Sequence, residues 1–195
     1  MLTRFPFRSV SFVAALCGVA LLAMLSSNDT VAQAERQFQQ PILVTSSGQA
    51  LDAFTVKTLL ARAGVNATYD QKVAAAALGD ARTIIIAMGA STKGFGQAGI
   101  TAETEVARTK AILEAAKAKS IPVIGIHIGG AERRKGLSVQ FVELVAPASD
   151  YLVVSQDGNA DGYFTELSKR SAIPLTIIER SLDVGKTLAA MMAQG

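Results

Sequence analysis

The sequence predicts a doubly wound α/β domain, Rossmann-like or flavodoxin-like, with a mostly parallel sheet of five or six strands and helices on both faces. Two observations predict it. Short apolar segments alternate with longer segments of helical periodicity along the chain. The short segments are apolar throughout rather than alternating with polar residues, which is typical of parallel strands that helices cover on both sides.

The expected strand over 83–88 is rich in β-branched residues. In order, the expected strands cover residues 42–44, 66–69, 83–88, 122–128, 151–155 and 175–178. The expected helices between and after them cover residues 51–63, 73–78, 101–119, 137–145, 162–169 and 183–192. In the first helix, Leu51, Phe54, Leu59 and Leu60 are expected on or near the buried face, and Gly64 ends it.

The helix over 101–119 has the clearest end signals. Thr101 can cap its amino end, and Glu103 and Glu105 follow in the first turns. Lys117 and Lys119 stand in the last turn, where a positive charge suits the helix dipole.

The first 34 residues have the pattern of a secretory signal peptide. Arg4 and Arg8 precede an apolar run over 10–25, and Ala32-Gln33-Ala34 resembles a cleavage site. A retained membrane anchor is the alternative, but the run is shorter than the roughly 20 residues that a spanning helix needs. We therefore expect export through the general secretory route to the periplasm or the extracellular space, with no stable membrane anchor after cleavage. Residues 35–40 then form a short polar tether, and 41–195 a single domain.

The composition of the cleaved chain excludes several classes of protein. It has 17 basic and 15 acidic residues, so its net charge of +2 gives no basic surface for nucleic acid. It has no cysteine and therefore no disulfide. The absence of tryptophan and the low aromatic content argue against a carbohydrate platform of stacked rings. We expect no cofactor and no metal.

Four loops at the predicted carboxyl ends of the strands contain glycines and small polar side chains. Ligands of open parallel sheets bind at this edge, near the point where the strand order reverses. The candidate ligand-binding residues are Ser46, Ser47, Gln49, Ser91, Thr92, Lys93, His127, Gly129, Gly130, Arg133, Asn159 and Asp161. Glycines let backbone N–H groups approach a ligand, and basic side chains add positive charge, so we expect a small anionic molecule. The alternative is that these residues serve turn geometry alone.

Two arginines follow the glycine pair of the fourth loop. A helix that starts near Gly130 places adjacent residues on different faces, so one of Arg133 and Arg134 is expected to face the ligand. We assign that role to Arg133, because a guanidinium can hold a carboxylate or phosphate with two parallel hydrogen bonds. Arg134 is expected at the surface.

His127 is the only histidine of the chain. It is the candidate catalytic residue of an alternative function, a small secreted hydrolase, with Ser46, Ser47 or Ser91 as nucleophile and Asp157 as the third group. No G-x-S-x-G motif identifies the serine. The other readings of His127 are a hydrogen-bond donor to an anion and a structural residue at a strand end.

Two motifs match only in part. Residues 94–99 satisfy G-x-G-x-x-G, the motif of dinucleotide-binding loops. The preceding strand, however, is expected to end near Met88, and no acidic residue ends the next strand at the distance that the motif requires. Residues 157–162 match the start of a calcium loop, whose closing position is Ser168 instead of glutamate. Asp157 and Asn159 are expected in turns instead, with Asp161 as a helix cap.

The segments PILVTSSGQ (41–49), GASTKGFGQAGI (89–100), HIGGAERRKGLS (127–138) and DGNADGYFTEL (157–167) together resemble DUF6305, a domain family of secreted bacterial proteins. The resemblance covers most of the chain after residue 40. It implies a signal peptide and one α/β domain, and it implies no activity. A binding role for a transporter or sensor, an enzymatic role and a protein-interaction role therefore stay open.

Overall fold

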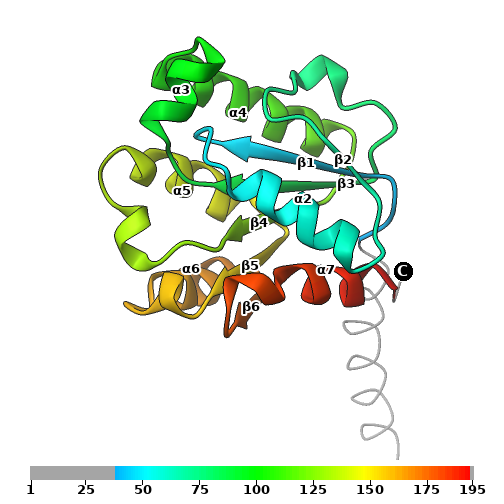
Figure 1. Ribbon diagram of the computed structural model, residues 1–195, viewed down its shortest axis with the longest axis vertical. Helices are drawn as coiled ribbons and strands as arrows, with labels where there is room; N and C mark the ends of the chain where they lie inside the picture. The colour runs from blue at the N-terminus through cyan, green and yellow to red at the C-terminus, as the bar shows by residue number, and fades with distance from the viewer. Residues whose placement is uncertain (1–37, 194–195) are drawn as a thin grey trace, which may run out of the picture. The chain divides into compact units, whose positions relative to one another are not determined.

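The computed structural model describes residues 38–193, and these form a doubly wound α/β fold (Figure 1). The sheet has six parallel strands in the order β2-β1-β3-β4-β5-β6. The predicted fold class is confirmed, and the strand order is of the flavodoxin-like kind. The order reverses between β1 and β3, so their carboxyl ends mark the switch point of the sheet.

Five of the strands lie within one residue of their predicted bounds, and β1 is longer than predicted. They are β1 Ile42–Ser47, β2 Ala67–Tyr69, β3 Thr83–Met88, β4 Val123–His127, β5 Tyr151–Ser155 and β6 Leu175–Ile178. The first strand was expected to end at residue 44, but it pairs with β3 as far as Ser47. Ser46 and Ser47 are therefore buried strand residues rather than loop residues.

The helices are α2 Asp52–Arg62, α3 Thr92–Ala98, α4 Ala102–Ala118, α5 Val139–Val145, α6 Tyr163–Ser171 and α7 Val184–Ala193. Short 3₁₀ turns cover Ala75–Ala77, Ala131–Arg134, Gly136–Ser138, Ala146–Ala148, Asp157–Asn159 and Ser181–Asp183. None of the helices among residues 38–193 is both long enough and apolar enough to span a membrane.

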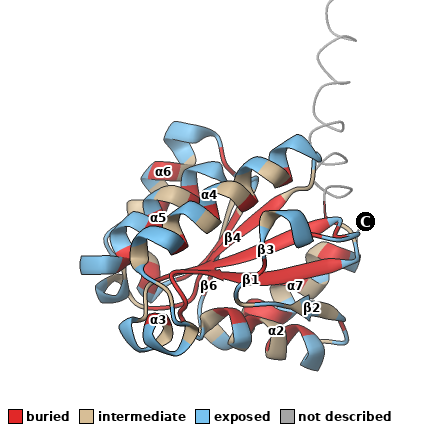
Figure 2. Cartoon of the chain, turned by 90° about the horizontal axis from the view of Figure 1, so that it is seen from above, coloured by how far each residue is buried: buried red, intermediate tan, exposed pale blue. Residues whose placement is uncertain are grey.

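Two apolar layers enclose the sheet (Figure 2). On one face, Ile85 and Val153 pack under α2 and α7. On the other, Ile84 and Val154 pack under α4, α5 and α6. Neighbouring residues of one strand thus point into different apolar layers, which is why the strands are apolar throughout. Burial of each such side chain contributes about 1.5–3 kcal/mol.

Thr101 caps α4 as predicted. Its hydroxyl accepts a hydrogen bond from the Thr104 amide, and the Thr104 hydroxyl accepts one from the Thr101 amide. Glu105 lies on the stripe of α4 that faces the sheet, together with Thr109 and Ile112, and is fully buried.

Three local expectations are wrong. The helix expected over 73–78 is only the 3₁₀ turn Ala75–Ala77, because a segment this short lacks the hydrogen bonds that offset helix nucleation. Leu51 and Phe54 are 69% and 53% exposed, because α2 presents Ala53, Val56, Leu59 and Leu60 to the core instead.

The third concerns α3, which replaces the expected loop. The Ser91 hydroxyl accepts a hydrogen bond from the Gly94 amide at its amino end, and Gly99 ends it in the left-handed conformation. Gly94 lies in the first turn of this helix. A Cβ at that residue would lie 2.2 Å from the Gln49 carbonyl oxygen, so the glycine serves a close approach of two backbones.

The predicted signal peptide, and the part of the tether before residue 38, lie outside the described residues. Phe38, expected in the tether, is 2% exposed and packs edge-on against Tyr151. The amide and the carbonyl of Gln39 both bond to the Thr83 hydroxyl. The packed domain therefore includes residues 38 and 39.

Candidate functional site

The loops that follow β1 and β3 meet at the switch point. Gly48 has φ of +100°, and a Cβ there would lie 2.4 Å from the Gly89 carbonyl oxygen. Gln49 and Ala90 form an isolated β-bridge next to this contact. The two loops therefore close over the ends of their strands, and an open space lies beside them.

That open space is a hollow of about 420 Å³ between the loops that follow the carboxyl ends of β1 and β2, and α3 borders it. We call it the Gln49 hollow. Its lining residues are Gln49, Leu51, Asp70, Gln71, Lys72, Ser91, Lys93, Gly94, Gln97 and Ala98. The volume lies within the range of roughly 300–1,000 Å³ that is usual for small-ligand sites.

Two glutamines join the walls of the Gln49 hollow. Gln49, 1% exposed with φ of +60°, donates from Nε2 to the Gln71 carbonyl at 3.3 Å. Gln71 donates from its own Nε2 to the Gln49 carbonyl at 3.2 Å. Because a carbonyl can only accept, this pairing fixes the orientation of the Gln49 amide. Its Oε1 is buried with no donor among the described residues.

A buried ion pair lies beneath these loops. Glu105 accepts a hydrogen bond from the Gly48 amide at 2.9 Å and contacts Arg108 at 2.8 Å. Arg108 donates to the Ser46 carbonyl and, at 3.0 Å, to the Val73 carbonyl. The pair thus ties the loop after β1 to the segment after β2. These two segments supply Gln49 and Gln71 to the hollow.

The sequence analysis gave Glu105 and Arg108 no role in the site, although the sequence contains a signal for Glu105. Glu105, Thr109 and Ile112 recur at the spacing of one helix face, so an acidic residue belongs to an otherwise buried stripe.

His127 is 1% exposed at the end of β4. Its Nδ1 lies 3.2 Å from the Met88 carbonyl oxygen, which requires the proton on Nδ1. Nε2 is then an acceptor, and it is buried without a partner in the described part of the chain. Burial lowers the pKa of His127, while the Met88 carbonyl, the Asp52 carboxylate and the nearby Gly130 backbone oppose this and the Arg134 charge adds to it. The ring is therefore neutral at pH 7.

Acid is expected to destabilise the domain through His127. Between its folded-state pKa and the ordinary value of 6.5, the unfolded chain binds a proton that the folded chain does not. The contribution to the free energy of unfolding is thus complete above pH 6.5. It falls with decreasing pH by up to about 1.4 kcal/mol per pH unit. Urea unfolding between pH 7.5 and 5.5 should show a smaller slope for His127→Gln. Equal slopes would show that another group is responsible.

The serine, His127 and Asp157 of the alternative hydrolase function do not form a hydrogen-bonded triad. The Ser46 hydroxyl donates to the Ala50 carbonyl, and the Ser47 hydroxyl bonds to Thr109. The Ser91 hydroxyl caps α3, and Asp157 accepts a hydrogen bond from the Gly158 amide. None of these residues bonds to the His127 ring, because each serine serves the backbone or helix next to it.

The two adjacent arginines differ in environment, and the expectation that Arg134 lies at the surface is wrong. The Arg134 side chain is 10% exposed, pairs with Asp161 at 2.5 Å and lies 4.4 Å above the Tyr163 ring. Its hydrogen bond holds the pKa of Asp161 below the ordinary value. The Arg133 side chain is 53% exposed and pairs with Asp52 at 3.2 Å. The 3₁₀ turn directs Arg134 toward α6 and Arg133 toward α2.

Arg134→Ala is expected to lower the free energy of unfolding by about 1–2 kcal/mol, because it removes a stacked, largely buried guanidinium. Arg133→Ala is its matched control, with an expected loss of at most about 0.5 kcal/mol. Urea unfolding of the two variants measures the difference. A larger loss for Arg133→Ala would contradict this description of the loop.

The predicted site residues form two separate groups rather than a single site. Gln49, Ser91 and Lys93 line the Gln49 hollow, and the exposed Thr92 begins α3 beside it. The second group lies at the ends of β4 and β5 and consists of His127, Gly129, Gly130, Arg133, Asn159 and Asp161.

Asn159 and Asp161 both act at the start of α6. The Asn159 side-chain oxygen accepts hydrogen bonds from the Phe164 and Thr165 amides. Asp161 accepts one from the Tyr163 amide and pairs with Arg134. The expected cap of this helix is therefore shared, with Asn159 making two of its bonds. Within residues 38–193, no cluster of three or more His, Cys, Asp or Glu side chains could hold a metal ion.

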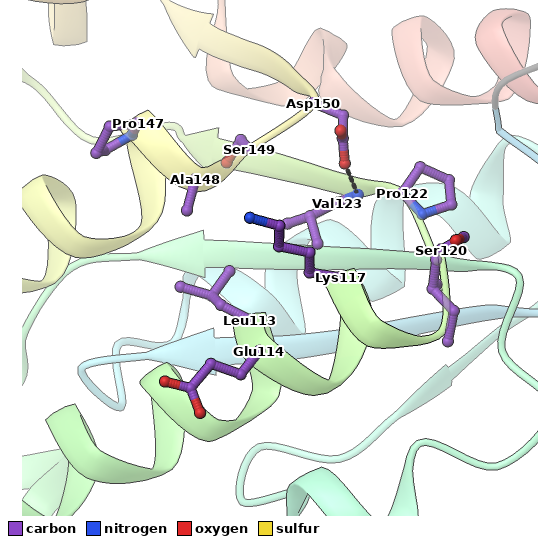
Figure 3. Close-up of a pocket in the computed structure, with 11 residues that line it drawn as sticks. Leu113, Glu114, Lys117, Ser120, Pro122, Val123, Pro147, Ala148, Ser149 and Asp150 are labelled. Carbon is purple, nitrogen blue, oxygen red and sulfur yellow. Dashed lines mark hydrogen bonds between the residues drawn. The ribbon is translucent and has the colours of Figure 1, made fainter.

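A larger hollow of about 720 Å³ lies at the opposite edge of the sheet, between α4 and the turn before β5 (Figure 3). Asp150, on its wall, accepts a hydrogen bond from the Val123 amide at 2.7 Å. Its other charged residues, Glu114 and Lys117, have opposite signs. This hollow is bigger, but it lies away from the switch point and its charges favour no ligand class.

The family model of a domain of unknown function, DUF6305, matches residues 39–192. The chain belongs to this family. The DUF6305 match spans all six strands of the sheet, including both groups of candidate residues. No curated protein matches the chain.

Among solved structures, the DUF6305 chain is similar to AlinE4, an esterase of the SGNH-hydrolase family. The two are 14% identical with a TM-score of 0.29, over 72% of this chain and 75% of that chain. A point mutant of the same esterase is 13% identical with the same TM-score and coverage. Similarity of this size carries no argument about chemistry.

Proposed function

We propose that the DUF6305 domain binds a small anionic molecule, with a carboxylate or phosphate group, in the Gln49 hollow. One observation carries the proposal. At the switch point of the sheet, the exposed Lys93 stands beside the buried Gln49 and the half-buried Gln71, which bond to each other, and it has no ion-pair partner among the described residues.

The charges of the Gln49 hollow support an anion. Its lining has two basic side chains, Lys72 and Lys93, and one carboxylate, that of Asp70. Asp70 accepts a hydrogen bond from the Lys72 amide at 2.8 Å, and the Lys72 ammonium donates to the Ala98 carbonyl at 3.4 Å. Lys93 is thus the cation with the most freedom to meet a ligand, while the side-chain amides of Gln71 and Gln97 offer further hydrogen bonds.

Binding is better supported than hydrolysis, because the described residues contain no hydrogen-bonded pair of serine and His127. Together with the signal-like first 34 residues, the proposal describes an exported binding domain. A transporter or sensor that receives the ligand would be its partner.

The test is a titration of the isotope-labelled protein with sodium phosphate, followed by the side-chain amide resonances of Gln49 and Gln71 in ¹⁵N spectra. We expect saturable shifts that sodium chloride of equal ionic strength does not produce. Lys93→Gln should weaken binding by about fivefold, the upper range for an exposed charge pair. Lys169→Gln, on α6, is the control and should have no effect. Unsaturable shifts, or equal affinity in the two variants, would contradict the proposal.

A further inference from the structure

A separate hollow of about 280 Å³ lies between the carboxyl end of α2 and the segment that enters α7. We call it the Leu182 hollow. Its lining residues are Leu59, Arg62, Ala63, Arg180, Leu182, Asp183 and Lys186. It shares no residue with the Gln49 hollow.

The apolar part of the Leu182 hollow lies beside a close approach of α2 and α7. A Cβ at Gly185 would lie 2.4 Å from the Leu59 carbonyl oxygen, so the two helix backbones are nearly in contact there. Leu59 of α2 and Ala63, the residue directly after α2, line the hollow. Leu182 borders it from the other side and is 64% exposed. An exposed leucine beside a hollow offers apolar surface that a partner can cover.

The rim of the Leu182 hollow is positively charged. It carries three basic side chains and one carboxylate, that of Asp183. Arg180 donates to Asp183 from Nε at 3.1 Å and from Nη2 at 2.8 Å, so these two charges neutralise each other. Arg62 and Lys186 are exposed and make no ion pair with another described residue. They stand on different helices, one on each side of the hollow.

We propose that the Leu182 hollow is a docking site for an acidic peptide segment of a partner protein. One large apolar side chain of the segment contacts Leu59, Ala63 and Leu182. Carboxylates on either side of that side chain pair with Arg62 and Lys186. The charge of the rim selects an acidic segment, and the small apolar lining selects a single side chain.

The arrangement favours a peptide over an anionic amphiphile. An amphiphile has one anionic head and a long chain, so it would use one of the two cations and extend beyond the apolar lining. A peptide carries carboxylates on both sides of an apolar residue, which matches cations on two different helices. This inference stands whether or not the Gln49 hollow binds an anion.

The experiment is an NMR titration of the isotope-labelled protein with the peptide acetyl-Glu-Asp-Leu-Asp-Glu-amide. We expect saturable shifts of the Ala63, Leu182 and Lys186 backbone amides, and weaker binding as sodium chloride is raised. Replacing the peptide's leucine with alanine should weaken binding roughly tenfold, because it removes most of the buried apolar area. A peptide with glutamine and asparagine in place of the acids should lose a similar factor.

Variants of the protein locate the site. The double variant Arg62→Gln with Lys186→Gln should weaken binding of the acidic peptide roughly tenfold while leaving the asparagine-glutamine peptide unaffected. Leu182→Asn should weaken binding of both peptides. Because Leu182 is exposed, the melting temperature should stay unchanged, and circular dichroism checks this. Lys169→Gln is the control and should bind as the parent protein does.

Three results would overturn the proposal. The first is shifts spread over the lysines of the whole surface without saturation. The second is equal binding of the acidic peptide by the double variant and the control. The third is saturable binding of decanoate at the Leu182 hollow with no binding of the peptide, which would make it an amphiphile site.

Discussion

Glu105→Gln is expected to lower the free energy of unfolding by about 3–5 kcal/mol, the usual cost of removing one partner from a buried ion pair. The Glu105 side chain is fully buried, and the Arg108 side chain is 14% exposed. Glutamine has nearly the same shape, so the expected loss comes from charge. It leaves the Arg108 guanidinium in the interior without the carboxylate that faces it at 2.8 Å.

The control for this substitution is Glu166→Gln, which removes one partner of an exposed pair with Lys169 on α6. It should change the free energy of unfolding by no more than about 0.5 kcal/mol. Urea unfolding followed by circular dichroism measures both variants. A loss below 1 kcal/mol for Glu105→Gln would mean that solvent reaches the pair, and that our description of it as a buried ion pair is wrong.

The double variant Glu105→Leu with Arg108→Met tests what the pair holds. In some proteins, replacing a buried pair by apolar residues costs nothing. Here the Gly48 amide and the Ser46 and Val73 carbonyls would lose their partners. Each buried group left unsatisfied costs about 1–3 kcal/mol. We therefore expect the double variant to stay destabilised, because the pair satisfies the backbone of the loops that carry Gln49 and Gln71.

Features that depend on local sequence were predictable. The apolar strands, such as Thr83–Met88, and the Thr101 cap of α4 need only neighbouring residues and a general rule for burial or capping. The fold class follows from their alternation. The carboxyl edge of the sheet is a position in that fold, so Gln49 and Lys93 could be placed near each other without knowing any contact.

Features that depend on contacts between distant segments were not predictable. Arg133 and Arg134 are neighbours in a 3₁₀ turn, and only the positions of Asp52 and Asp161 decide which guanidinium is buried. Gly94 serves a close approach to the Gln49 carbonyl, which lies 45 residues earlier in the chain. His127 was a candidate catalyst because it is the only histidine, but no serine among the described residues is hydrogen-bonded to its ring.

Gly185→Ala is expected to lower the free energy of unfolding by about 2 kcal/mol, although alanine favours helices. The added Cβ would lie 2.4 Å from the Leu59 carbonyl oxygen and 2.5 Å from its carbon. Both atoms belong to the backbone of α2, so no side chain can rotate away and the helices must separate. Overpacking of this kind costs about 1–3 kcal/mol and occasionally more, against a gain of roughly 1 kcal/mol from helix propensity.

Gly96→Ala is the matched control, because Gly96 also lies within a helix, α3, and a Cβ there meets nothing within 4 Å. It should raise the free energy of unfolding by up to about 1 kcal/mol, so the two substitutions have opposite signs. Urea unfolding of both variants decides the matter, and stabilisation by Gly185→Ala would show that α2 and α7 are not in close contact. Because Leu59 also lines the Leu182 hollow, a folded Gly185→Ala protein should bind the acidic peptide more weakly than the Gly96→Ala protein does.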